Sequence, residues 1–328
     1  MKNKLLSIFI SISLMMSCLA LLPSCNAKDG RDGGDIKIVC SVFPLYDWVS
    51  NIVGGEERVS VSLLVSGGGD LHSYEPSAAD IIKLADCDMV IYVGGESDAW
   101  LTEALDKNPR EDRREISLIE YESITKLALS DEFILGDEQE HEHEHEHEHG
   151  HGEQTDEHIW LSPNNAKAAV NLICDVLCEL DAENAETYEE NLEKYLSELD
   201  SLGELLNVPK DTSPLIFADR FPFVYLFHDN NIPYYAAFSG CTAEVDATFD
   251  TIIRLASLAD ELSAEYILVT ESPIPSLAET VIETTKAKSA KILSLDSMQS
   301  VTLKDMENGV SYISIMKNNL EILASIIE

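Results

Sequence analysis

The chain has 328 residues, of which 45% are hydrophobic and 25% are charged, proportions that are ordinary for globular proteins. At the usual ~100–200 residues per domain, this length favours two domains. The 60 Asp and Glu residues outnumber the 22 Lys and Arg residues, which gives a formal net charge of -38. A surface this acidic repels phosphate backbones, so nucleic-acid binding is excluded and cations are the natural small partners.

The N-terminus has the pattern of an export signal. Residues 1–24 place Lys2 and Lys4 ahead of a long apolar run, and a small residue precedes Cys25. This arrangement is typical of a lipoprotein signal peptide, after which Cys25 is lipidated; a plain signal peptide with a coincidental cysteine is the alternative. Residues 25–35, rich in Gly and Asp, are predicted to be a flexible tether. The mature chain is therefore expected outside the cytoplasmic membrane, held to it by lipid.

Residues 36–162 alternate short apolar runs with helical patterns. Ser77 and Asp80 have the spacing of a capping box, which marks the start of a helix. Near-continuous apolar strands separated by helices indicate a parallel sheet covered on both faces, so this segment is predicted to be an N-terminal α/β lobe. The expected strands are Ile36–Ser41, Val59–Val65, Asp88–Val93 and Glu115–Leu118, and the expected helices are Pro44–Val53, Ser77–Ala85 and Ser97–Asp106.

Residues 163–206 contain no strand pattern. Ser162 followed by Pro163 is a helix start, and the helical periodicity then continues to Leu206 with a bend or interruption near Asp181–Asn184. The second half is amphipathic, with leucines and tyrosines on one face and acidic residues on the other. We predict a stiff spine helix that links two lobes.

Residues 207–328 repeat the alternation of the first lobe. The fold class predicted for the chain is therefore α/β, with two similar parallel-sheet lobes bridged by a long spine helix. A cleft between the carboxyl ends of the two sheets is the expected ligand site. The expected strands are Pro214–Ala218, Ile232–Ala236, Glu265–Thr270 and Lys291–Leu295, and the expected helices are Phe221–His228, Ala247–Leu262, Pro275–Lys286 and Glu307–Ile327.

A low-complexity segment at 136–158, GDEQEHEHEHEHEHGHGEQTDEH, lies at the end of the first lobe. It has no aliphatic or aromatic residue to bury, so it is predicted to be a mobile loop. Imidazole is a preferred ligand of zinc, copper and nickel, and the interleaved Glu residues attract cations. We expect weak metal binding in several geometries, a solvated spacer being the alternative. The loop histidines expected to bind are His141, His143, His145, His147, His149 and His151.

Three further polar residues lie where strands or loops lead into helices. His72 follows the second expected strand in GGGDLHSYEP, His158 precedes Ser162 and Pro163 in DEHIWLSP, and Asp296 follows the last strand. Taken together, two histidines and a carboxylate at the junctions of two lobes predict a zinc or manganese site. The five cysteines after Cys25 show no spacing of a disulfide framework or a zinc site.

These motifs resemble the metal-binding solute-binding proteins of ABC transporters, the cluster A-I family. GGGDLHSYEPSAADI is similar to its first-ligand motif, DEHIWLSP to its second-ligand motif with Ser162 where Asp is usual, and AFSGCTAEVDATF to a characteristic turn. The resemblance covers residues 36–328. It implies two α/β lobes that hold one metal ion between them and deliver it to an ABC permease. The histidine-rich insertion is typical of the zinc-specific branch.

The chain departs from that family at one ligand position. The family's third ligand is a His or Glu in a segment that corresponds to Ala218-Asp219-Arg220-Phe221, so Ala218 occupies the ligand position. We predict that Asp219 takes this role. Glu271, Glu244, a water molecule and a histidine of the loop remain alternatives.

The resulting functional prediction is a monomeric, lipid-anchored receptor that captures Zn²⁺ in the interlobe cleft through His72, His158, Asp296 and Asp219, without catalysis. Manganese is the less favoured metal, and a manganese-specific receptor is one alternative. A secreted zinc-dependent hydrolase is another, although the HExxH spacing at His141 lacks the core-packing helix face that such enzymes need. A zinc-storage or adhesin protein that relies on the loop is the third.

Overall fold

The structure is a computed structural model that describes residues 35–66, 71–128, 133–135, 155–241, 247–271 and 276–327. Several predictions fall outside these residues. They are the signal segment with Cys25, the tether up to residue 34, Glu244, and the loop histidines His141, His143, His145, His147, His149 and His151.

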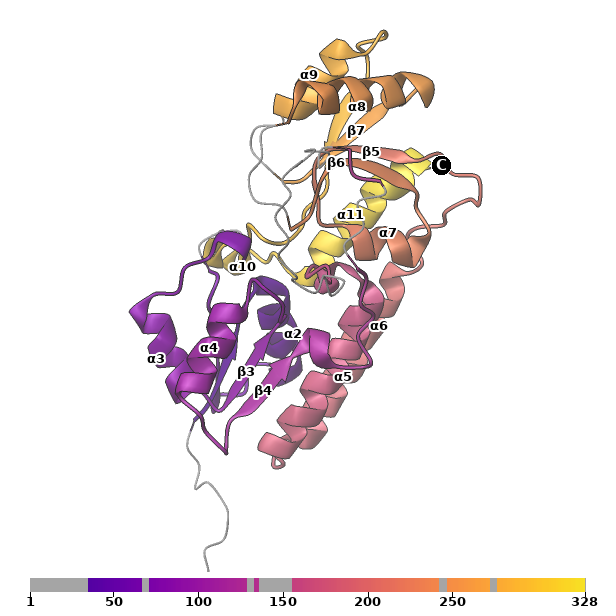
Figure 1. The fold of residues 1–328 in the computed structure, drawn as a ribbon. Coiled ribbons are helices and arrows are strands. Elements are labelled where there is room, and N and C mark those ends of the chain that lie inside the picture. Colours follow the sequence, from indigo (N-terminus) through magenta and orange to yellow (C-terminus); the bar gives the residue numbers. More distant parts are fainter. Residues whose placement is uncertain are drawn as a thin grey trace, which may run out of the picture. The chain divides into compact units, whose positions relative to one another are not determined.

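The N-terminal lobe is built on a parallel sheet in the order β2-β1-β3-β4 (Figure 1). Alternate residues of its strands face opposite sides: Ile38 of β1 packs in the core formed with α2, whereas Val39 packs with α3 and α4. Ser77 and Asp80 form the predicted capping box at the start of α3. The elements are β1 (Ile36–Cys40), α2 (Phe43–Val53), β2 (Val59–Leu63), α3 (Ala78–Asp86), β3 (Met89–Tyr92), α4 (Ala99–Lys107) and β4 (Arg114–Ser117).

The C-terminal lobe repeats this topology in the order β6-β5-β7-β8, so the prediction of two similar parallel-sheet lobes is confirmed. Helices α8 and α9 share a core with one face of this sheet, and α7 and α11 with the other. The elements are β5 (Leu215–Phe221), α7 (Val224–Asn230), β6 (Tyr234–Ser239), α8 (Phe249–Glu261), β7 (Tyr266–Val269), α9 (Ser276–Thr284), β8 (Lys291–Ser294), α10 (Leu303–Glu307) and α11 (Tyr312–Ile327).

Strand β5 is longer than its sequence pattern indicated. The expected strand ended at Ala218, but β5 continues to Phe221 with a register irregularity between Phe217 and Arg220. The aromatic rings of Phe217 and Phe221 lie 5.0 Å apart, so the core holds this extra length of strand. Asp219 therefore lies within a strand, and the helix expected from Phe221 begins at Val224.

The segment expected to be one spine helix is a helical hairpin. Helices α5 (Pro163–Leu180) and α6 (Ala185–Leu202) lie side by side, and the expected interruption is a complete reversal (Figure 1). Asp181 stabilises the turn by accepting hydrogen bonds from Tyr188 Oη at 2.7 Å and Asn184 Nδ2 at 2.9 Å. Periodicity predicts which face of a helix is buried but not its direction, so it does not distinguish a bent helix from a hairpin. Helix α6 packs against both α2 and α11.

The C-terminal helix also begins later than expected, at Tyr312, because Gly309 adopts φ 89° and separates it from α10. Tyr312 is buried and meets Trp48 of α2, with ring centroids 5.3 Å apart. Tyr195 of α6 donates a hydrogen bond to Asp47 of α2 at 3.0 Å. The two lobes thus share one continuous core. Among the described helices, none combines the length and apolarity required to span a membrane.

Candidate metal centre

His72 follows β2 in the chain, and its side chain contacts Ser97 in the loop after β3. It lies in a short 3-10 helix, η1 (Leu71–Ser73), and its side chain is 13% exposed. Its Nδ1 atom is 2.6 Å from Ser97 Oγ and 3.8 Å from Glu157 Oε2. Protein oxygens engage Nδ1, and the Nε2 atom is turned toward His158.

The Glu157 carboxylate lies close to the backbone at Gly95, which places it beside His72. Its Oε1 accepts hydrogen bonds from the backbone N–H groups of Glu96 at 2.5 Å and Ser97 at 3.2 Å. Gly95 has φ 87°, and a Cβ atom there would lie 2.3 Å from Glu157 Oε1. Only glycine permits both the left-handed backbone and this contact.

His158 is fully buried and precedes the short helix η3 (Ile159–Leu161). Asp156 Oδ1 lies 3.0 Å from His158 Nδ1 and also accepts a hydrogen bond from the backbone N–H of His158 at 2.8 Å. Tyr225 of α7 donates to the Asp156 carbonyl oxygen at 2.7 Å, which fixes the segment to the second lobe. The anchoring of Nδ1 by a carboxylate is the arrangement that orients metal-binding histidines.

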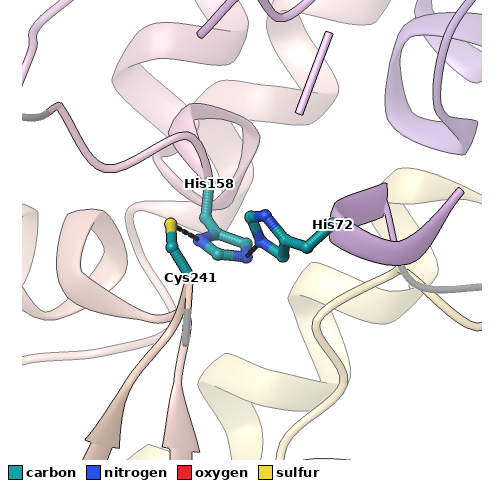
Figure 2. Close-up of side chains that lie close together, drawn as sticks. All are labelled: His72, His158 and Cys241. Carbon is teal, nitrogen blue, oxygen red and sulfur yellow. Dashed lines mark hydrogen bonds between the residues drawn. The ribbon is translucent and has the colours of Figure 1, made fainter. Parts of the chain in front are cut away.

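The two imidazoles face each other through their Nε2 atoms. His72 Nε2 and His158 Nε2 are 3.3 Å apart (Figure 2). Two nitrogens bound at ~2.0–2.1 Å to one tetrahedral zinc ion would be about 3.3–3.4 Å apart. The pair therefore already has the separation that a shared metal ion requires.

Cys241 is the third member of this group. It follows β6, and its Sγ lies 3.9 Å from His158 Nδ1 and 4.0 Å from Asp156 Oδ2. One ligand atom from each of His72, His158 and Cys241 lies within 4.8 Å of the others (Figure 2). Cys241 is not among the ligands predicted from the sequence. Its position at the carboxyl end of a parallel strand, in the characteristic turn, is the signal that could have identified it.

The loop after β8 supplies a further neighbour. Gln299 Nε2 lies 3.4 Å from His158 Nε2, and the buried Gln299 Oε1 has no hydrogen-bond partner in the part of the chain that the structure describes. Trp160 Nε1 donates to the Ser297 carbonyl oxygen at 2.9 Å, which fixes this loop beside η3. Both lobes thus contribute to the surroundings of the two histidines.

The carboxylates expected to complete the site make other contacts. Asp219 Oδ2 accepts two hydrogen bonds from Thr270, at 2.6 and 3.1 Å. Asp296 Oδ1 accepts from the Met298 backbone N–H at 2.7 Å, and burial together with the nearby Glu271 charge raises the pKa of Asp296 to about 6. Among the described residues, neither Asp219, Asp296 nor Glu271 belongs to the group formed by the histidines and the cysteine.

Charge in the site is arranged for a cation. Burial lowers the pKa of His158, but the negative charge of Asp156 and its hydrogen bond outweigh this effect and raise the pKa to about 10. At neutral pH the buried imidazole is therefore protonated when no metal is bound. A divalent ion would displace this proton, and the buried Asp156 carboxylate would offset the charge of the ion.

The model of one family, the zinc-uptake complex component A, periplasmic (ZnuA), matches residues 38–326. The chain is 29% identical over 319 residues to the zinc-binding lipoprotein AdcA of Streptococcus pneumoniae strain R6, covering 96% of this chain and 60% of AdcA. It is 25% identical over 318 residues to the high-affinity zinc uptake system protein ZnuA of Bacillus subtilis, covering 94% and 95%. The crystal structure of the Zn(II)-bound ZnuA-like domain of S. pneumoniae AdcA aligns with a TM-score of 0.69 at 26% identity, covering 90% of this chain and 99% of that domain.

Proposed function

The chain belongs to the zinc-uptake complex component A family, and from this premise we propose that it is an extracytoplasmic receptor that captures Zn²⁺ between its lobes and delivers it to an ABC permease. The ion is the cargo of a binding protein, and no enzymatic step is involved. The chain spans only about 60% of the length of AdcA, so activities that depend on the rest of that protein are not part of the proposal.

The observation that carries the proposal is the convergence of two histidines from distant parts of the chain. His72 and His158 are 86 residues apart in sequence, yet their Nε2 atoms lie 3.3 Å from each other. In each ring Nδ1 is engaged by a protein oxygen, from Ser97 and Asp156 respectively. Neutral imidazole nitrogens with this orientation are suited to zinc. We propose that these two histidines are direct zinc ligands.

The remaining features of the receptor follow from the sequence and the relatives. We propose that Cys25 is lipidated and anchors the chain, which the lipoprotein name of AdcA supports. We further propose that the histidine-rich segment at 136–158 gathers zinc and passes it to His72 and His158, and that the receptor acts as a monomer. Deleting residues 137–154, which keeps Asp156, should then slow zinc loading at low zinc concentration, and unchanged loading would contradict this role.

The central test is zinc titration of the purified protein and of single histidine variants. His72→Ala and His158→Ala should each raise the Kd for Zn²⁺ more than about 100-fold, because loss of a residue that only supports a ligand already costs about 10–100-fold. His228→Ala is the matched control, since the His228 side chain is 56% exposed on α7 and outside the group.

The same variants distinguish the alternative functions. If the tightest zinc site survives both His72→Ala and His158→Ala, the receptor assignment is wrong and zinc storage by the histidine-rich segment is favoured. A receptor should also restore growth under zinc starvation to a strain that lacks its own zinc-binding component, whereas the His72→Ala variant should not.

A further inference from the structure

We propose that Cys241 binds the captured metal as a thiolate, together with His72 and His158, and that this sulfur makes the site select zinc over manganese. The inference rests on the proposed receptor function and specifies the metal class that the site accepts. Metal binding replaces the S–H bond with a metal–sulfur bond, and the proton leaves to solvent.

The first support is the position of Cys241 in the fold. The residue follows the carboxyl end of β6, on the side of His158 away from His72 (Figure 2). Gly240 brings this turn against the imidazole: a Cβ atom at Gly240 would lie 3.0 Å from His158 Cε1 and 2.7 Å from Pro222 Cα. The missing side chain thus allows the backbone that carries the thiol to pack directly on the ring.

The second support is the distance that the sulfur must travel. A Zn–S bond of ~2.3 Å beside a Zn–N bond of ~2.0–2.1 Å places sulfur and nitrogen about 3.5 Å apart. The Cys241 Sγ atom is 3.9 Å from Nδ1 of His158, the nitrogen that Asp156 holds, and it lies within 4.8 Å of one nitrogen of each histidine ring. To bind the same ion as the two Nε2 atoms, the sulfur moves from the Nδ1 side of the His158 ring toward them, through rotation about the Cα–Cβ bond. Cys241 is only partly buried, so core packing does not lock its side chain.

The third support is the chemistry of the neighbouring positions. Ala218 has no donor atom and is buried in β5, and both oxygens of Asp219 already accept hydrogen bonds, from Thr270 and from the Arg220 backbone N–H. Within the described ranges, the group of candidate ligands contains the thiol and the two imidazoles. The thiolate therefore adds a directly bound negative charge to that of the buried Asp156, which together offset a buried dication.

A thiolate determines which metals bind well. Sulfur is a soft ligand that suits zinc and its thiophilic relatives, whereas manganese prefers carboxylate, carbonyl and water oxygens. Nitrogen and sulfur ligands also follow the order in which manganese binds more weakly than zinc. The site should consequently load zinc in the presence of a large excess of manganese.

The test uses Co²⁺ as a spectroscopic substitute for Zn²⁺, with competition titrations against Mn²⁺. The wild-type cobalt complex should show sulfur-to-cobalt charge-transfer absorption in the near ultraviolet. Cys241→Ser should lose this absorption and raise the Kd for Zn²⁺ about 100-fold. Cys241→Asp should reduce the preference for zinc over manganese at least tenfold. Cys178→Ser, at another partly buried thiol on α5, is the matched control and should leave all these values unchanged.

The outcomes separate this inference from the function on which it rests. If His72→Ala loses zinc while Cys241→Ser keeps wild-type affinity and the cobalt complex lacks the absorption, the receptor function stands and the thiolate ligand is refuted. If His72→Ala also retains tight zinc, the receptor function itself fails. A thermal unfolding transition equal to that of the wild type establishes that each metal-free variant is folded.

Discussion

Replacing Asp156 with asparagine tests whether the carboxylate that orients His158 also strengthens zinc binding. Asp156 Oδ1 lies 3.0 Å from His158 Nδ1 and accepts the His158 backbone N–H at 2.8 Å. The Oδ1 atom of an asparagine can accept the same hydrogen bonds from the same place, so the ring orientation is kept and only the charge is lost. Asp156→Ala removes the charge and the hydrogen bonds together.

The size of the effect follows from distance and charge. A zinc ion on His158 Nε2 would lie roughly 6 Å from the Asp156 carboxylate, across the imidazole ring. A dication and a carboxylate at that distance attract each other by about 1.4 kcal/mol even with the dielectric constant of water, which corresponds to a tenfold change in Kd. We therefore expect Asp156→Asn to raise the Kd for Zn²⁺ about tenfold. Asp156→Ala should raise it about 100-fold, the upper end for residues that support a metal ligand.

The assay is a competition titration of Zn²⁺ between each variant and a chromogenic chelator of known affinity. The control is Asp181→Asn, the same chemical change at a buried carboxylate in the α5–α6 turn, where Asp181 accepts a hydrogen bond from Tyr188. The reasoning is refuted if Asp156→Asn and Asp156→Ala both bind zinc within twofold of the wild type while remaining folded.

Two predictions concern stability and packing. Burial raises the pKa of Asp47 to about 6, so ionisation of this carboxyl opposes folding and the free energy of unfolding decreases as pH rises from about 4 through 6. Asp47→Asn removes this pH dependence. Between pH 4 and pH 7, the free energy of unfolding of the variant should therefore rise by roughly 2–3 kcal/mol relative to that of the wild type, as measured by denaturant unfolding. Equal pH profiles for the two proteins would contradict this expectation. Gly240→Ala would place a Cβ 3.0 Å from His158 Cε1 and closer still to the backbone, so it should destabilise the metal-free protein by about 1–3 kcal/mol and weaken zinc binding, measured by thermal unfolding and titration.

The sequence was most informative where one local pattern determines one local structure. Continuous apolar runs such as Ile36–Cys40 and Tyr266–Val269 are strands because both faces of each sheet are covered by helices. His72 and His158 could be identified because each follows or precedes a recognisable element boundary. The structure then shows how close they lie, with their Nε2 atoms 3.3 Å apart.

The sequence was least informative where distant segments decide the outcome. The spacing of Cys241 from the other cysteines does not indicate a metal site. Its neighbours in space, His158 and Asp156, lie 83 and 85 residues earlier in the chain. Asp219 is adjacent to Ala218, which occupies the ligand position, but successive side chains of a strand point to opposite faces of the sheet. The Asp219 carboxylate accepts a hydrogen bond from Thr270 instead. The reversal at Asp181–Asn184 likewise depends on the packing of α5 on α6.

The aromatic contact of Trp48 with Tyr312, and the hydrogen bond of Tyr195 to Asp47, tie α2, α6 and α11 into a rigid block. Such a block resists wide hinge opening of the halves. In the receptor that we propose, zinc would then enter and leave through small displacements of the turns that carry His72 and Cys241. A transporter that unloads this protein would need to displace only these turns and break a few local contacts. The packing of α2, α6 and α11 would stay unchanged between cycles.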